Sequence, residues 1–336
     1  MRSGCVQIGS SGNERGQRRS QIVRRSKLAS WLGSAPGAVY LLALLSVGLT
    51  ILTPHFFSVA NLTNVCLQVA VLTIVALGMT LVILTEGIDL SLGPLLGLCG
   101  VVMAMVVVSG MPLWLAIGAA ALIGAAFGTV NGTLVAYVGM PPFIVTLGTF
   151  GIAQSLAMVL TEGNSVTGLP EAVRWFNDGA PLGIPVPLWV TAVVFAITYV
   201  LLHRTKFGRY TFAIGGNRRA LVLSGSNAGF YQVLVYVYAG VLTALASFIM
   251  TARMNAAHPT IGVGLEFDAI AAVILGGTSF EKGHGGIVGT LIGALAVGVL
   301  RNGLNLMGVS TEWQVAVVGI VIIAAVSLDS LRGHYS

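Results

Sequence analysis

The sequence is short of charge. Only 8% of its 336 residues are charged, while 56% are hydrophobic; a typical soluble domain is about 25% charged. A chain of this length with so few polar groups cannot present a water-compatible surface around its core. The composition therefore excludes a soluble protein and predicts an integral membrane protein.

Cysteines and catalytic motifs are also scarce. The three cysteines, Cys5, Cys66 and Cys99, are too scattered for a metal site or a disulfide, and we expect the last two to be small core residues. Neither G-x-x-x-x-G-K-[ST], H-E-x-x-H nor G-x-S-x-G occurs. The sequence thus predicts no enzyme, no cofactor and no metal in this chain. Uphill transport would need an ion gradient or a separate ATPase.

Apolar stretches predict an all-α, polytopic membrane protein of about 10 transmembrane helices over residues 35–330. The stretch 266–280 is short, so we expect it to be broken or re-entrant. Cut at Gly, Pro and polar clusters, the stretches are 36–53, 64–85, 92–109, 112–137, 141–161, 187–203, 230–252, 266–280, 286–304 and 312–329.

Basic residues predict which ends and loops face the cytoplasm. Seven of the 17 Lys and Arg residues lie in the first 27, which favours a disordered cytoplasmic segment over 1–34 rather than a nucleic-acid tail. Loop 204–229 carries five basic residues, whereas 162–186 carries only Arg174. The positive-inside rule then predicts a cytoplasmic tail at 331–336. It places 204–229 and 281–285 inside, and 54–63, 162–186 and 253–265 outside.

Five spans precede the 162–186 loop and five follow it. Two halves that each contain an odd number of spans enter the membrane from opposite sides, so a structural repeat between them has to be inverted. The count therefore allows two inverted five-helix halves. Glycines recur at four-residue spacing and predict close helix packing. They are Gly124, Gly128 and Gly132 in one half, and Gly285, Gly289 and Gly293 in the other.

The nonapeptide T-E-G-I-D-L-S-L-G at 85–93 places two carboxylates between apolar stretches. Charges inside membrane segments are costly and usually face a protein interior or a cavity. Glu86, Asp89 and Ser91 therefore either line a translocation path or form a helix break whose carboxylates are satisfied by backbone N–H groups and water. Other ionisable residues fall near span ends, which argues against an ion-coupled carrier; these are Glu266, Asp268, Arg301 and Glu312.

The basic loop contains a helix-start signal, Gly215-Gly216-Asn217, because Asn is a good N-cap residue. We expect a short helix over 218–224 with apolar contacts from Ala220, Leu221 and Leu223, and a stop at Gly225. Such a helix either packs on its own chain or fits a partner's groove.

Taken together, several motifs resemble the permease subunits of ribose-type ABC sugar importers, in the branched-chain amino-acid/sugar permease superfamily. The resemblance covers nearly the whole chain after Ser34. The resemblance rests on the sequence motifs at residues 57–64, 85–93, 128–132, 141–149, 205–217 and 267–290. It implies an inner-membrane permease that pairs with itself or with a paralogue and transports a pentose, hexose or related polyol. It also implies two ABC ATPase subunits that use the ATP, and a periplasmic sugar-binding protein.

By the same resemblance, 217–225 would couple the permease to the ATPase. This assigns a role to Asn217, Arg218, Arg219, Ala220, Leu221, Leu223, Ser224 and Gly225, although the family often has an acidic residue or Pro where Arg218-Arg219 stand. We expect Glu281 and Lys282 in a tight turn, and Arg174 and Arg253 as contacts for the binding protein. Polar positions open to a passing sugar are Thr146, Thr149, Gln154, Asn302 and Asn305. Two alternatives stay open: a branched-chain amino-acid permease and an ion-coupled carrier.

Overall fold

The computed structural model describes residues 37–280 and 283–333, with side chains in the last helix to Ala324. In these ranges the chain is helical and has no strand; Val166 and Ala257 form an isolated antiparallel bridge. The predicted basic segment 1–34 and the pair Glu281–Lys282 lie outside the described residues.

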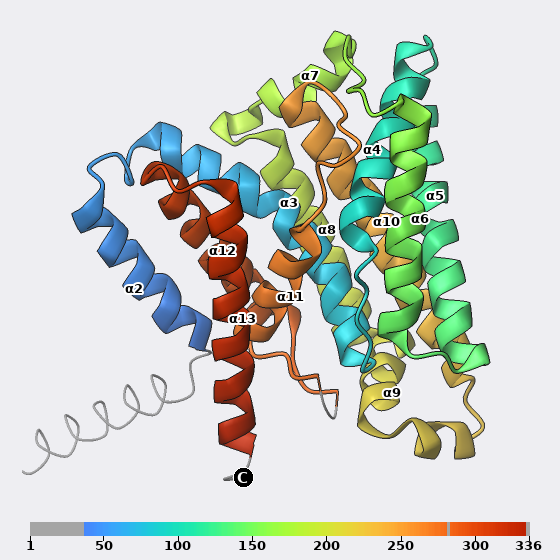
Figure 1. The fold of residues 1–336 in the computed structure, drawn as a ribbon. Helices are drawn as coiled ribbons and strands as arrows, with labels where there is room; N and C mark the ends of the chain where they lie inside the picture. Colours follow the sequence, from blue (N-terminus) through green and yellow to red (C-terminus); the bar gives the residue numbers. More distant parts are fainter. Residues whose placement is uncertain (1–36, 281–282, 334–336) are drawn as a thin grey trace, which may run out of the picture. The chain divides into compact units, whose positions relative to one another are not determined.

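The helices follow one another along the chain as shown in Figure 1. They are α2 (Gly37–Leu52), α3 (Val59–Leu84), α4 (Leu92–Val108), α5 (Leu113–Thr133), the π-helix η1 (Leu134–Val138), α6 (Pro142–Thr161), α7 (Glu171–Asp178), the 3₁₀ turn η2 (Pro181–Gly183), α8 (Val186–Arg204), α9 (Lys206–Leu223), α10 (Ala228–Met254), α11 (Leu265–Leu275), α12 (Ile287–Leu306) and α13 (Thr311–Gly333).

Each apolar stretch singled out in the sequence overlaps one of these helices, so the all-helical prediction is confirmed. By length and composition, 6 of the described helices can cross a membrane, and α2, α4 and α13 are shorter apolar helices. The stretch 266–280 is indeed short, because α11 ends at Leu275. The final helix runs to Gly333, past the expected end at residue 330.

The two longest helices, α3 and α10, form the centre of the fold. Every residue of α3 from Val69 to Leu84 is buried, as expected for a helix that is apolar on all sides. Gly78 of α3 packs on Ala239 of α10, so close that a Cβ at Gly78 would lie 2.9 Å from the Ala239 Cα atom. Helix α10 also packs on α4 and α5, while α3 packs on α11 and α12.

Glycine contacts bring helix backbones together as the four-residue spacing predicted. Gly124 of α5 faces the backbone of Gly240 in α10, and Gly289 of α12 faces Gly276. Gly285 is different: it lies in the turn before α12 with φ +147°, in the left-handed region. Small residues at these positions allow the close approach on which packing in membranes depends.

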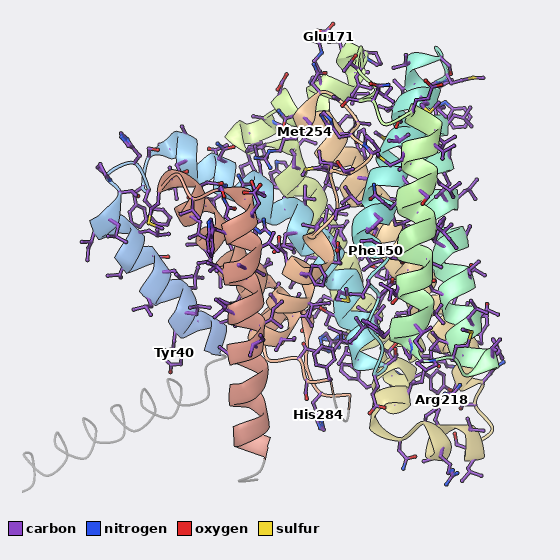
Figure 2. The ribbon with its side chains drawn as sticks, in the orientation of Figure 1. Tyr40, Phe150, Glu171, Arg218, Met254 and His284 are labelled. Carbon is purple, nitrogen blue, oxygen red and sulfur yellow. The ribbon has the colours of Figure 1, made fainter. Side chains whose placement is uncertain are left out.

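Two groups of elements mark opposite ends of the helix layer. At the end that we call the α9 end, Gly215 of α9 contacts the last carbonyl of α3, at Leu84, and the backbone of Gly283. At the α7 end, Phe176 of α7 stacks edge to face on Phe248 near the end of α10. Figure 2 shows Arg218 and Glu171 at these two ends.

The segment 253–265, expected to be an outer loop, instead folds back against the helices. Residues 255–264 run beside the first half of α4 (Figure 1). A Cβ at Gly93 would lie 2.6 Å from the Gly262 carbonyl oxygen, and one at Gly97 would lie 2.7 Å from that of Pro259. Glycines on α4 leave room for this second backbone, which the polarity of 253–265 does not reveal; its outer placement stays a prediction.

Candidate functional site

The helix break predicted at 85–93 is real, but its two carboxylates lie in different surroundings. Glu86 follows the end of α3 in a left-handed conformation, with φ 59°, and is exposed. Asp89 is buried, at 1% exposure. Glu86 therefore belongs to the surface at the α9 end, and only Asp89 and the buried Ser91 face the protein interior.

Asp89 is held by donors from two parts of the chain, and a third part supports one of them. Its Oδ1 accepts hydrogen bonds from the Ser91 backbone N–H (3.0 Å) and the Ser91 hydroxyl (2.5 Å). The Asn131 amide of α5 donates to the same carboxylate at 3.4 Å and to Ser91 Oγ at 3.0 Å. Thr149 of α6 donates to Asn131 Oδ1 at 2.8 Å. Buried polar groups in such a complete network stabilise a unique arrangement, so this cluster fixes the start of α4 against α5 and α6.

In the predicted coupling segment, α9 is helical from Lys206 and bends at Asn217, where φ is −162°. As predicted, Asn217 caps a new helical turn: its Oδ1 accepts a hydrogen bond from the Ala220 N–H at 2.9 Å. Gly225 then adopts φ +81°, a conformation that favours glycine and ends the helix.

The apolar side chains of this segment point in different directions. Leu221 is buried and packs with Ile214 and Ala228 of the same chain. Val222 and Leu223 are 54% and 82% exposed. Leu221 therefore anchors the segment and does not present a free surface, which corrects the sequence-based expectation for this residue.

Arg218 connects the coupling segment to the end of α5. Its Nη2 donates a hydrogen bond of 2.8 Å to the Ala136 carbonyl oxygen in η1. Arg219 and Ala220 are exposed, and the exposed Ser224 turns its hydroxyl back to the Leu221 carbonyl oxygen at 2.7 Å.

The two arginines predicted to contact a binding protein do not share one surface. Arg174 is exposed on α7, beside the exposed Trp175. Arg253, near the end of α10, is half-buried and donates to Asn64 Oδ1 at 3.4 Å. It lines a cavity of about 600 Å³.

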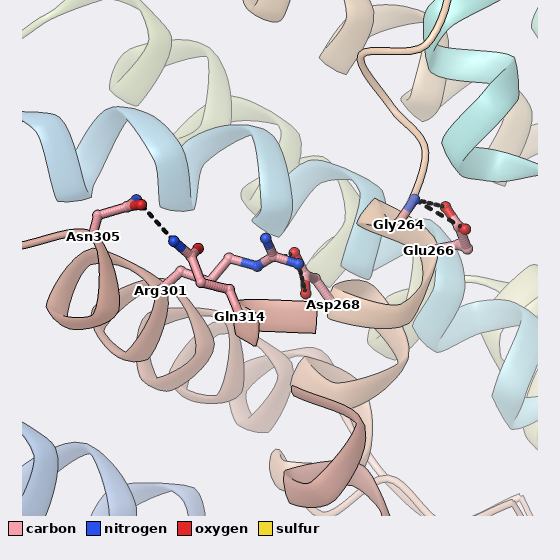
Figure 3. A network of polar contacts seen from close by, with 6 residues as sticks. All are labelled: Gly264, Glu266, Asp268, Arg301, Asn305 and Gln314. Carbon is pink, nitrogen blue, oxygen red and sulfur yellow. Dashed lines mark hydrogen bonds and ion pairs between the residues drawn. The ribbon is translucent and has the colours of Figure 1, made fainter. Parts of the chain in front are cut away.

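That cavity contains an ion pair which the sequence did not reveal. Arg301 Nη2 donates to Asp268 Oδ1 at 2.7 Å, and Arg301 Nε lies 2.7 Å from Oδ2 without being aligned for a hydrogen bond (Figure 3). Glu266 and Asp268 lie in the first turn of α11, near a helix end as predicted, and both are buried. Glu266 accepts from the Gly264 N–H at 3.0 Å. The sequence shows two opposite charges in two separate apolar stretches, but it does not indicate that these two residues contact each other.

The described residues offer a polar cavity, a helix break and an anchored surface helix, but no group of three or more His, Cys, Asp or Glu side chains that could hold a metal ion. Of the polar path candidates, Thr149 joins the Asp89 network and Asn302 exchanges hydrogen bonds with Asn61. Asn305 lines the cavity. This arrangement suits passage of a solute better than chemistry on one.

Comparison with known proteins places the chain in a family. The family model described as "Branched-chain amino acid transport system / permease component" matches residues 61–326. The chain belongs to this family of permease components. No solved structure matches it significantly.

Named relatives are similar over nearly their whole length. The chain is 46% identical over 313 residues to the ribose import permease protein of Escherichia coli (strain K12), covering 92% of this chain and 97% of that protein. It is 48% identical over 290 residues to the ribose import permease protein of Bacillus subtilis (strain 168), covering 86% and 90%. The galactose/methyl galactoside import permease protein of Escherichia coli (strain K12) is 35% identical over 317 residues, covering 88% and 94%.

Proposed function

We propose that this protein is the membrane-spanning permease of an ATP-driven importer for a monosaccharide, a pentose, hexose or related polyol. The observation that carries the proposal is full-length similarity to permease proteins named for ribose, galactose and, at 39% and 35% identity, D-allose and fructose. The chain is a transport subunit and not an enzyme. Because it lacks a phosphate-binding loop, ATP is hydrolysed by a separate partner subunit.

The test is reconstitution in liposomes with the cognate ATPase and binding protein. Uptake of radiolabelled ribose, galactose and fructose is measured with and without ATP. ATP-dependent uptake of one of these sugars is expected. Uptake of leucine instead would favour the branched-chain amino-acid alternative named by the family description. Uptake driven by an ion gradient without the ATPase would favour a secondary carrier.

We further propose ten transmembrane helices in two inverted halves, α2–α6 and α8–α13. Three observations support this proposal. The two long helices run in opposite directions, because α3 ends at the α9 end and α10 begins there. Each long helix also packs on helices of the opposite half in a similar way: α3 packs on α11 and α12, and α10 packs on α4 and α5. A Gly, an aliphatic residue and an acid recur after each of the two long helices. Gly87-Ile88-Asp89 lies between α3 and α4, and Gly264-Leu265-Glu266 forms the start of α11.

The proposed orientation places the α9 end in the cytoplasm of an inner-membrane protein, together with both termini, and the α7 end in the periplasm. The bias of basic residues supports it. Labelling of intact cells with a membrane-impermeant thiol reagent tests it, in a background without native cysteines. Ala172→Cys, exposed on α7, should react and Ser224→Cys should not. The reverse pattern would overturn the orientation.

For the partners, we propose two ATPase subunits docked on the exposed part of 217–225, around Arg219, Val222 and Leu223. A periplasmic binding protein would dock near Arg174 on α7, and the lipid-facing helices would pair with a second copy or a paralogue. The support is the exposure of these residues at opposite ends of the helix layer. Co-purification of differently tagged copies distinguishes a homodimer from a heterodimer.

A further inference from the structure

We infer that the cavity lined by α3, α10, α11, α12 and α13 is a binding site for a neutral, polyhydroxylated solute, with the Asp268–Arg301 ion pair as its floor. This inference rests on the proposed function and adds the place where the sugar is held. The cavity, of about 600 Å³, lies within the range of small-molecule pockets, about 300–1,000 Å³. Its polar lining residues are Gln68, Arg253, Asp268, Arg301, Asn305, Thr311 and Gln314.

The position of the ion pair gives the cavity a floor. Asp268, Arg301 and Gly264 line both this cavity and a second, smaller one of about 220 Å³. The second cavity continues along α13 past Val315, Val318 and Ile322, farther from the α7 end, and is lined mostly by apolar side chains. The ion pair therefore separates a polar compartment near the α7 end from an apolar one along α13.

Charge in the cavity favours a neutral solute. Asp268 and Arg301 neutralise each other at 2.7 Å. A cation would meet two guanidinium groups, those of Arg253 and Arg301, and would compete for a carboxylate that is already paired. An anion could reach the Arg301 guanidinium only by breaking the same pair, and removing one partner of a buried ion pair is strongly destabilising. The Arg253 guanidinium is already hydrogen-bonded to Asn64.

Spare hydrogen-bonding groups favour hydroxyls. Gln68 lines the cavity and makes no hydrogen bond within the described part of the chain. The Gln314 Nε2 group donates to Asn305 Oδ1 at 2.6 Å (Figure 3). This leaves the Asn305 amide as a donor and Gln314 Oε1 as an acceptor. A sugar hydroxyl both donates and accepts hydrogen bonds. The hydroxyls of a sugar can therefore pair with both the donors and the acceptors of this lining.

The remaining lining suits the carbon face of a sugar ring. Leu72 and Met250 offer apolar contacts from α3 and α10, and Ile261 and Leu265 offer them from the segment that folds back. Pockets for small ligands typically combine such an apolar lining with a few placed polar groups. The folded-back segment 255–264 therefore forms one wall of the cavity.

The experiment compares two variants with a matched control in the complete reconstituted transporter. Gln68→Leu and Asn305→Leu each remove hydrogen-bonding groups while leaving the ion pair in place. Asn164→Leu makes the same kind of change in an exposed loop outside the cavity. The measurements are initial uptake rates for ribose, galactose and fructose, the KM for loaded binding protein, and the yield of assembled complex.

Each cavity variant should lower kcat for uptake by about three- to tenfold, the effect of one lost hydrogen bond to a solute. It should also change the rate ratio between sugars, with an unchanged KM for the binding protein. The control should match the wild type. Unchanged rates and ratios in both assembled variants would overturn the inference while the wild type still imports sugar. A uniform loss with unchanged ratios would also overturn it, in favour of a structural role. Failure of the wild type to import any sugar would instead contradict the proposed function.

Discussion

The Arg218 guanidinium donates a hydrogen bond of 2.8 Å to the carbonyl oxygen of Ala136, and so joins the bend in α9 to the end of α5. The carbonyl belongs to η1, a π-helical turn whose last carbonyls lack helical partners. We expect this bond to pass a movement of the surface helix to α5, which packs along α10. The bond is a mechanical link between the proposed ATPase surface and the helix layer.

Replacing Arg218 by Ala should uncouple ATP hydrolysis from transport. Loss of one charge-assisted hydrogen bond should raise the ATP consumed per sugar imported, by roughly two- to tenfold. The ratio is measured in proteoliposomes with a phosphate-release assay. Arg209→Ala, also exposed on α9 but without a side-chain hydrogen bond to another helix in the described residues, is the matched control. An unchanged ratio in the Arg218 variant would show that the link carries no motion.

Asp substitutions at Leu221 and Leu223 should fail in different ways. Leu223→Asp changes an exposed side chain and should leave folding intact while weakening ATPase co-purification. Leu221→Asp buries an unpaired charge, at a cost of several kcal/mol, and should reduce the yield of folded protein. Size-exclusion chromatography and pull-down separate the two. Leu182→Asp, exposed at the α7 end, serves as control. Normal ATPase binding by Leu223→Asp would remove 217–225 as the docking segment.

Replacing Asn131 by Leu should destabilise the fold through the Asp89 network. The change removes a hydrogen-bond partner from each of Asp89, Ser91 and Thr149. An unsatisfied buried polar group costs about 1–3 kcal/mol of folding free energy. Thermal aggregation in detergent should begin at a lower temperature. Thr129→Val removes a hydroxyl on the exposed face of the same helix and should behave as the wild type. Equal stability of both variants would mean that the network is dispensable.

Gly93→Ala should also be destabilising, because the new methyl group would meet the Glu266 carboxylate and the Gly262 carbonyl oxygen. Overpacking of this kind typically costs about 1–3 kcal/mol. Gly118→Ala places a methyl in open space on α5 and should be neutral or stabilising. The two variants are compared by thermal aggregation. Similar temperatures would contradict the tight fold-back of 255–264.

Local features of the fold could be read from the sequence. Hydropathy located the helices, the polar nonapeptide marked the break before α4, and Asn217 and Gly225 marked the ends of a helical turn. These features depend only on residues that are close to one another in the sequence. The sequence also indicated transport, through the motifs that resemble sugar permeases.

Features that depend on distant residues could not be read in this way. The Asp268–Arg301 pair joins α11 to α12, and Leu221 turns inward because Ile214 and Ala228 are there to receive it. Neither fact follows from residue type. The fold-back of 255–264 was hidden for the same reason, since its contact surface is provided by glycines of α4, more than a hundred residues earlier in the chain.

The Asp89 network also has a consequence for biogenesis. A ribosome that has delivered α3 and α4 to the membrane has delivered the carboxylate and Ser91, but not the Asn131 amide or the Thr149 hydroxyl. Until α5 and α6 arrive, α4 begins with an acid that lacks those partners. We therefore expect the Asp89 network to close only after α6 has entered the membrane, so that α3 to α6 reach their final packing together.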